Sequence, residues 1–188
     1  MDGWDTSKVT TMYWMFQNCK SLESLDLSSF NLSGITNGGM VSFGNCSNLK
    51  SVIFGKNIDT SKITNMGSMF SRCTSLETLD LSMFDTSNVT NMRNMFDGCK
   101  NLKSVNLSGW DTSKVTTMQQ MFTGCTSLEA LDLSMFITPL LKNMSLMFNG
   151  CASLKKINLS NVTFDNEVDI SGIFLGCKAL EEIDIRKA

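Results

Sequence analysis

Seven cysteines are the residues of this sequence with the widest chemical repertoire, because a thiol can form a disulfide, bind zinc or act as a nucleophile. The chain has no histidine and no two cysteines separated by two residues, which argues against zinc binding and against Cys–His catalysis. The cysteines recur every 26 or 27 residues, at Cys19, Cys46, Cys73, Cys99, Cys125, Cys151 and Cys177.

This interval predicts a ladder of cysteines, one in each coil of a stacked array. Free cysteine is among the most buried residue types and packs as a small hydrophobe. A uniform stack does not supply the geometry of a disulfide at every step. We therefore predict seven buried, reduced and stacked thiols.

Carboxylates also recur, at every second coil, as Asp26, Asp80, Asp132 and Asp184. Such a column could form a calcium ladder or an acid–base pair. Calcium usually needs six or more oxygens that converge on one point. We favour solvated positions on a strand surface, and expect no catalytic residue, no metal, no cofactor and no enzymatic activity in this chain.

The same period positions a whole block of residues around each cysteine. A phenylalanine lies three residues before each cysteine and a leucine three residues after it. That leucine begins an L-x-x-L-x-L pattern, as in Leu102, Val105 and Leu107, which is typical of leucine-rich repeats. Its last four residues alternate as a short strand should. The strands are predicted at Ser24–Leu27, Ser51–Phe54, Thr78–Leu81, Ser104–Leu107, Ala130–Leu133, Lys156–Leu159 and Glu182–Ile185.

Before each strand the apolar residues are spaced three or four residues apart, as in a helix, and not two apart as in a strand. Met92, Met95, Phe96 and Cys99 fall on one helical stripe, which predicts a short helix with a packed methionine–phenylalanine face. Gly98 follows, where a left-handed residue is needed, and its equivalents are glycine or asparagine except Arg72. Helices are predicted at Asn65–Ser71, Asn91–Asp97 and Thr117–Thr123, with counterparts in the other coils.

The predicted fold is thus a right-handed α/β solenoid of the leucine-rich-repeat type. Residues 1–188 form a single array of about seven coils, each centred on one cysteine, with one short parallel strand and one short helix per coil. The array starts in mid-repeat and stops on a strand-like Ile183–Ile185 segment, so we expect the chain to be a fragment of something longer.

A second period, of two coils, appears in the charges. The residue after each repeat leucine reads Glu23, Lys50, Glu77, Lys103, Glu129, Lys155 and Glu181. Alternating signs in a stack attract one another, although an exposed pair contributes only about 0.2–1 kcal/mol. The net charge is −2 with both signs mixed, and no apolar run approaches the roughly 18 residues of a membrane span. We therefore expect neither a nucleic-acid partner nor a membrane span in this fragment.

The repeated T-N-M-x-x-M-F-x-x-C-x-x-L-x-x-L-x-L-S-x-F-D-T-S pattern resembles the BspA-like leucine-rich-repeat proteins. It is closest to the surface repeats of about 26 residues found in mycoplasmas, lactic-acid bacteria and Listeria. The resemblance covers nearly all of the chain, and 85–133 fits it best. It departs at Asn31–Phe43, Ile137–Leu141 and Val162–Val168, where the outer loop should change. It implies a cell-surface or extracellular array linked with adhesion.

Two functions fit this sequence. The first is a recognition and adhesion module that binds an extracellular protein or glycan of a host or neighbouring cell. The second is a structural spacer that presents another domain away from the cell wall, and the uncapped ends leave end-to-end self-association open. For the first function the candidate ligand-facing residues lie on the strands, and Gly34–Val41 is the next candidate surface. The strand residues are Thr78, Asp80, Ser104, Asn106, Asp132 and Asn158.

Overall fold

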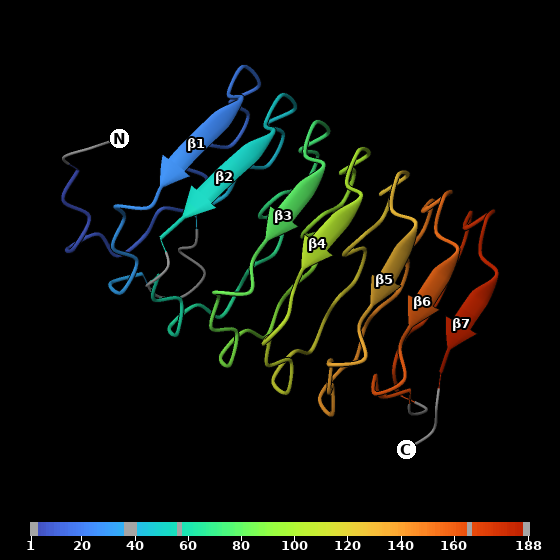
Figure 1. The fold of residues 1–188 in the computed structure, drawn as a ribbon. Coiled ribbons are helices and arrows are strands. Elements are labelled where there is room, and N and C mark those ends of the chain that lie inside the picture. Colours follow the sequence, from blue (N-terminus) through green and yellow to red (C-terminus); the bar gives the residue numbers. More distant parts are fainter. Residues whose placement is uncertain (1–3, 36–40, 56–57, 165–166, 186–188) are drawn as a thin grey trace.

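The computed structural model of the 188-residue chain describes residues 4–35, 41–55, 58–164 and 167–185. The chain winds into a stack of coils, and each coil places one short strand on the same side of the stack (Figure 1). The strands pair in parallel, and each pair joins consecutive coils. The predicted parallel-strand solenoid is confirmed, and the predicted strand ends are correct to within one residue. The strands are β1 (Ser24–Leu27), β2 (Ser51–Phe54), β3 (Thr78–Asp80), β4 (Ser104–Asn106), β5 (Ala130–Asp132), β6 (Lys156–Asn158) and β7 (Glu182–Asp184).

The strand side of the stack is divided into blocks. Strand β1 pairs with β2, β3 pairs with β4, and β5, β6 and β7 form a three-stranded sheet. Among the described strands, no pairing joins β2 to β3 or β4 to β5. The first two blocks therefore contain two coils each, which matches the two-coil period of the charges.

A second line of contacts between coils continues past the division between β4 and β5. Single parallel bridges connect consecutive coils at one position that precedes the methionine turn. Because the line crosses from β4's coil to β5's coil, the coils stay in register where the main sheet is interrupted. The bridged residues are Asn65, Asn91, Thr117, Asn143 and Asp169.

The core lies between the strands and the turns and is built from identical columns. Within each strand the alternation of polar and apolar residues sends one side chain inward, so that Leu79 is buried while Thr78 and Asp80 are exposed. The phenylalanines before the cysteines stack ring on ring along the solenoid, with centroid separations of 5.2 to 5.9 Å. This aromatic column contains Phe16, Phe43, Phe70, Phe96, Phe122, Phe148 and Phe174.

No helix is present among the described residues, so the helices predicted at 65–71, 91–97 and 117–123 are wrong. Two consecutive turns replace each helix. In the third coil Met69 N donates to Met66 O at 3.4 Å, and Cys73 N donates to Phe70 O at 3.1 Å. These turns bury Met66, Met69, Phe70 and Cys73. The turns thus reproduce the spacing of three and four residues that a helical stripe would show.

The neighbouring coil explains why turns form here. Amides that an α-helix would pair within itself instead donate to the next coil. Ser68 N donates to Arg93 O at 2.9 Å, and Phe70 N donates to Met95 O at 2.9 Å. The stack therefore satisfies the backbone between coils, which a sequence window of one repeat cannot reveal.

Each turn holds its third residue at a positive φ, as a type II turn requires. At the second turn the predicted left-handed positions are confirmed, including Arg72 with a φ of 59° and Gly98 with a φ of 71°. At the first turn the same conformation is adopted by large side chains, among them Trp14 and Leu146. These non-glycine residues carry the cost of about 1–2 kcal/mol that a left-handed conformation imposes on an L-residue.

The cysteine ladder is present, with a correction at its ends. All seven cysteines are free thiols, and the five from Cys46 to Cys151 are buried. Cys19 is exposed and Cys177 is partly buried, so the prediction of seven buried thiols is wrong at these two positions. Each belongs to a terminal coil of the described stack, which has a neighbouring coil on one side only. No helix in the described part of the chain is long and apolar enough to cross a membrane.

Candidate binding surface on the strand face

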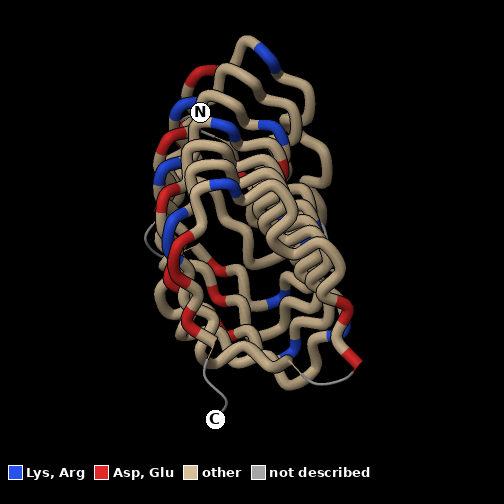
Figure 2. The backbone as a smooth tube through the Cα atoms, turned by 90° about the vertical axis from the view of Figure 1, so that its right-hand side faces the viewer, with Lys and Arg blue, Asp and Glu red and all other residues tan. Residues whose placement is uncertain are grey.

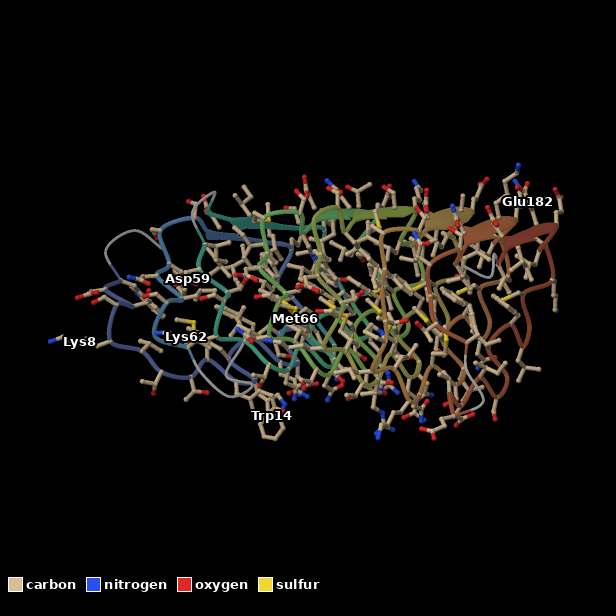
Figure 3. All side chains as sticks on the ribbon, turned by 90° about the horizontal axis from the view of Figure 1, so that it is seen from below. Lys8, Trp14, Asp59, Lys62, Met66 and Glu182 are labelled. Atoms are coloured by element: carbon tan, nitrogen blue, oxygen red, sulfur yellow. The ribbon has the colours of Figure 1, made fainter. Side chains whose placement is uncertain are left out.

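The strands present one continuous surface, here called the strand face, made of the outward side chains of β1 to β7. Figure 3 shows these side chains projecting from the ribbon along one side of the stack, where Glu182 is labelled. Trp14, in a turn of the first coil, lies on the opposite side. Each strand contributes two outward positions, and the second column reads Asp26, Ile53, Asp80, Asn106, Asp132, Asn158 and Asp184.

A hollow of about 460 Å³ lies across β2, β3 and β4. Its wall includes the hydroxyl groups of Ser51, Thr78 and Ser104, the carboxylate of Asp80 and the amide of Asn106. Four of the six residues singled out from the sequence therefore meet around one depression. The mixture of hydroxyl, carboxylate and amide groups can both donate and accept hydrogen bonds.

A second hollow, of about 280 Å³, lies across β5, β6 and β7 and contains the other two, Asp132 and Asn158. Each hollow is lined by a lysine that forms an ion pair: Lys50 of the first contacts Glu23, which is not part of that lining. In the second, Lys156 Nζ lies 2.6 Å from Glu182 Oε2, so an ion pair occupies part of its wall. The hollow over β2–β4 is the larger of these two, and we take it as the candidate polar site.

The carboxylates and amides at the strand ends are held in fixed orientations. Asp80 Oδ1 accepts the amide and the hydroxyl of Ser82 at 2.9 and 2.7 Å, and Asn106 Oδ1 accepts the same two groups of Ser108 at 3.1 and 2.8 Å. Aspartate and asparagine are equivalent in this Asx turn, because both supply the accepting oxygen. The column therefore alternates in charge without any change in local backbone structure.

These hydrogen bonds also keep the aspartates ionised. The backbone amide and the side chain of Ser82 lower the pKa of Asp80, and Ser134 lowers that of Asp132 in the same way. For Asp26 the side chain of Ser28 and then its amide lower the pKa. The three carboxylates therefore stay negative at neutral and mildly acidic pH.

The alternating charge ladder borders the strand face, and acidic and basic residues alternate along the left-hand edge of the stack in Figure 2. Each lysine contacts the glutamate of the coil before it: Lys50 contacts Glu23 at 2.8 Å, Lys103 contacts Glu77 at 2.7 Å and Lys155 contacts Glu129 at 3.0 Å. These ion pairs join coils within a sheet block, and their side chains are 50–68% exposed.

The strand face and its bordering ladder together are acidic. Nine carboxylates and four lysines give a net charge of −5, compared with −2 for the whole chain. The rest of the molecule is therefore net positive, and the acidic character is concentrated on one side. The carboxylates are Glu23, Asp26, Glu77, Asp80, Glu129, Asp132, Glu181, Glu182 and Asp184, and the lysines are Lys50, Lys103, Lys155 and Lys156.

The candidate site residues chosen from the sequence leave out one exposed residue of the second column. Ile53 follows the inward Val52 of β2, and it is 55% exposed between Asp26 and Asp80 of the same column. Its outward phase in the strand is the signal that could have found it. A second exposed apolar feature, the Tyr13–Trp14 ring pair with centroids 4.4 Å apart, lies away from the strand face. Most of the alternative loop Gly34–Val41 lies outside the described residues.

The strand face presents hydrogen-bonding and charged groups. The chain has no histidine, and the described residues contain no cluster of three or more cysteine or acidic side chains placed to hold a metal ion. The Asx turns use the aspartates to support backbone structure. What the arrangement offers is a rigid, regularly spaced array of polar groups.

A repeat solenoid of short parallel strands with one polar strand face defines the class of this protein. The chain matches the family described as "Mycoplasma protein of unknown function, DUF285" over residues 1–79 and 64–187. It belongs to this family, which agrees with the BspA-like repeats that the sequence resembles. No match was found among curated proteins.

Three solved structures are similar to the chain. A leucine-rich cell surface protein of Faecalibacterium prausnitzii is 18% identical, with 93% of this chain and 62% of that one covered and a TM-score of 0.40. A leucine-rich repeat protein of T. pallidum is 22% identical, with 98% and 65% covered and a TM-score of 0.45. A leucine-rich repeat protein of Bacteroides ovatus is 17% identical, with 92% and 63% covered and a TM-score of 0.36. The chain thus spans less than two thirds of the length of each.

Proposed function

We propose that this chain is a non-enzymatic recognition module of a bacterial cell surface. In this proposal the strand face binds an extracellular protein or glycan of a host or neighbouring cell. The main observation in favour of this proposal is the hollow over β2–β4. Its lining includes polar side chains of two paired strands, namely Thr78, Asp80, Ser104 and Asn106. The resemblance of the repeats to BspA-like surface proteins supports the surface location.

A strand face that is already ordered favours recognition, because no part of the binding free energy is lost in ordering the strands when a ligand binds. The strands lie on a core of buried leucines and stacked phenylalanine rings, and the strand-end oxygens are fixed by Asx turns. The spacer function stays the alternative. It is favoured by the ladders of cysteine and phenylalanine, which hold every coil to the next without involving the strand face.

An adhesion experiment separates the two functions. Beads coated with the purified chain are incubated with host cells and with extracellular-matrix proteins and glycans. Ser104→Tyr should reduce retention, because an aromatic ring on β4 fills the hollow without adding charge. Tyrosine is favourable on a strand, so folding should be preserved.

A matched control exists on the other side of the stack. Gln119→Tyr adds the same side chain at the position that Tyr13 occupies naturally in the first coil. This variant should keep full retention. Equal retention by wild type, Ser104→Tyr and bare beads would favour the spacer, whereas a loss with Gln119→Tyr alone would place recognition on the turns.

A further inference from the structure

We infer that the strand face binds an extended basic peptide in the polyproline II conformation, with a lysine or arginine at every third residue. This inference rests on the proposed function, since it names the partner of the same surface. The first observation that supports a basic partner is the negative charge of the strand face. The strand face and its bordering ladder have a net charge of −5, and the lysines of the ladder are already paired with glutamates.

The spacing of the carboxylates selects the conformation of the peptide. Asp26, Asp80 and Asp132 recur at every second coil. Paired strands lie about 4.8 Å apart, and beside the unpaired β2–β3 and β4–β5 steps the backbone hydrogen bonds from Ser75 N to Ser47 O and from Ser127 N to Lys100 O hold consecutive coils together, so two coils span about 9–10 Å. A polyproline II chain rises about 3.1 Å per residue with three residues per turn, so side chains three apart lie on one face about 9.3 Å from each other. A β-strand instead repeats its face about every 6.6 Å.

The other groups of the hollow suit the backbone of such a peptide. A polyproline II chain makes no internal hydrogen bonds, so its carbonyl groups are free to act as acceptors. Ser51, Thr78 and Ser104 place hydroxyl donors beside the carboxylate column. An α-helix satisfies its own carbonyl groups and would leave these hydroxyls unused. Ile53, exposed between two carboxylates of the column, offers an apolar contact for proline rings.

The aspartates can be neutralised without disturbing the fold. Asp80→Asn and Asp132→Asn keep the oxygen that accepts from Ser82 and Ser134, and Asn106 and Asn158 make the same turn naturally. The double variant Asp80→Asn/Asp132→Asn therefore removes two charges from the strand face only.

A matched control removes two charges elsewhere. Asp85 and Asp111 are exposed Asx-turn residues that accept the amides of Ser87 and Ser113, in loops after β3 and β4. Asp85→Asn/Asp111→Asn changes the net charge of the chain by the same amount. Denaturant unfolding of both double variants verifies that each is folded.

The probes are two synthetic peptides of equal composition, one with four Pro-Pro-Arg repeats and one with four consecutive arginines flanked by prolines. Binding is measured by fluorescence anisotropy at low and physiological salt. The repeat peptide should bind more tightly than the clustered one. Asp80→Asn/Asp132→Asn should weaken its binding about tenfold, since an exposed ion pair contributes roughly threefold. The control variant should stay within about twofold of wild type.

Every other result overturns the inference. Equal loss in both double variants would mean general electrostatic attraction, and equal binding of both peptides would mean that spacing is not recognised. Absence of binding would exclude this partner. None of these results decides the adhesion experiment. If bead retention depends on Ser104 but not on the aspartates, the chain is still a recognition module, and its ligand is not a basic peptide.

Discussion

The thiol of Cys99 donates to the backbone carbonyl oxygen of Phe70 in the preceding coil, at an Sγ–O distance of 3.0 Å. The same oxygen accepts the amide of Cys73 at 3.1 Å, which closes the turn of its own coil. Each cysteine from Cys46 to Cys177 repeats this contact with the phenylalanine 29 or 30 residues before it. The cysteine is thus both a core residue and the donor that joins one turn to the next.

Removal of this donor should destabilise the stack in its interior. Cys99→Ala deletes the hydrogen bond and leaves a small cavity, so the free energy of unfolding should fall by about 1–2 kcal/mol. Cys19→Ala is the control, because Cys19 is exposed and no coil precedes it among the described residues. It should change the unfolding free energy by less than about 0.5 kcal/mol. Equal effects in urea titrations would show that the ladder adds no stability.

Thiol reactivity should follow position along the array. In the native protein at neutral pH we expect Cys19 to react promptly with a thiol reagent and Cys177 more slowly. The five thiols from Cys46 to Cys151 are buried and should react only after denaturation. Mass spectrometry of the labelled peptides reads out each site. Prompt labelling of Cys99 would contradict the buried ladder.

Alkaline pH should unfold the array. Burial raises the pKa of Cys46 to about 11 and those of Cys99 and Cys151 to about 12, from an ordinary value of 9.0. The folded state then holds more protons than the unfolded state between these values, so stability is complete below pH 9 and falls as pH rises toward 12. Urea titrations at about pH 7, 9 and 10.5 measure the fall. A flat profile in the alkaline range would contradict the assigned burial.

The aromatic column predicts a large local cost for the loss of one ring. Phe96 is fully buried between Phe70 and Phe122, at centroid distances of 5.9 and 5.2 Å. Phe96→Ala should therefore reduce the unfolding free energy by about 3–5 kcal/mol. Hydrogen exchange should show the loss of protection concentrated in the coils on either side, because coils couple to their nearest neighbours. Uniform loss along the chain would argue for a globally cooperative core.

The turn conformation predicts opposite effects for two neighbouring substitutions. Gln120 has a φ of 58°, so Gln120→Gly should stabilise the protein by about 0.5–1 kcal/mol despite the flexibility that glycine adds to the unfolded chain. Gly124 has a φ of 69°, and a Cβ atom there would make only ordinary van der Waals contact with Gly98, so the backbone conformation sets the cost of Gly124→Ala at about 1–2 kcal/mol. Thermal unfolding of the two variants should shift in opposite directions, and a helix at this position would reverse both signs.

The sequence is sufficient to predict the strands because each one is specified by its own residues. The pattern Leu102, Val105, Leu107 has the period of a strand and predicts β4 to within one residue. The turns are mistaken for helices because Met92, Met95, Phe96 and Cys99 have the same spacing in both structures. The difference lies in where the amides donate, as when Phe96 N donates to Met121 O of the next coil.

For the candidate surface, the phase of each strand predicts which side chains point outward. It does not predict that Thr78, Asp80, Ser104 and Asn106 surround one hollow, because the hollow spans β2 and β3, which do not pair. The Asx role of Asp80 was missed as well, although the serine two residues later is visible in the sequence.

The pairing of Glu23 with Lys50 and of Glu77 with Lys103 restricts how such an array can change its length. Deletion of one coil would bring two glutamates or two lysines into adjacent positions and would join sheet blocks out of phase. Deletion or gain of two coils, 52 residues as measured from Cys73 to Cys125, preserves the alternation of glutamate and lysine between neighbouring coils. Chains of this kind should therefore differ in length by even numbers of coils.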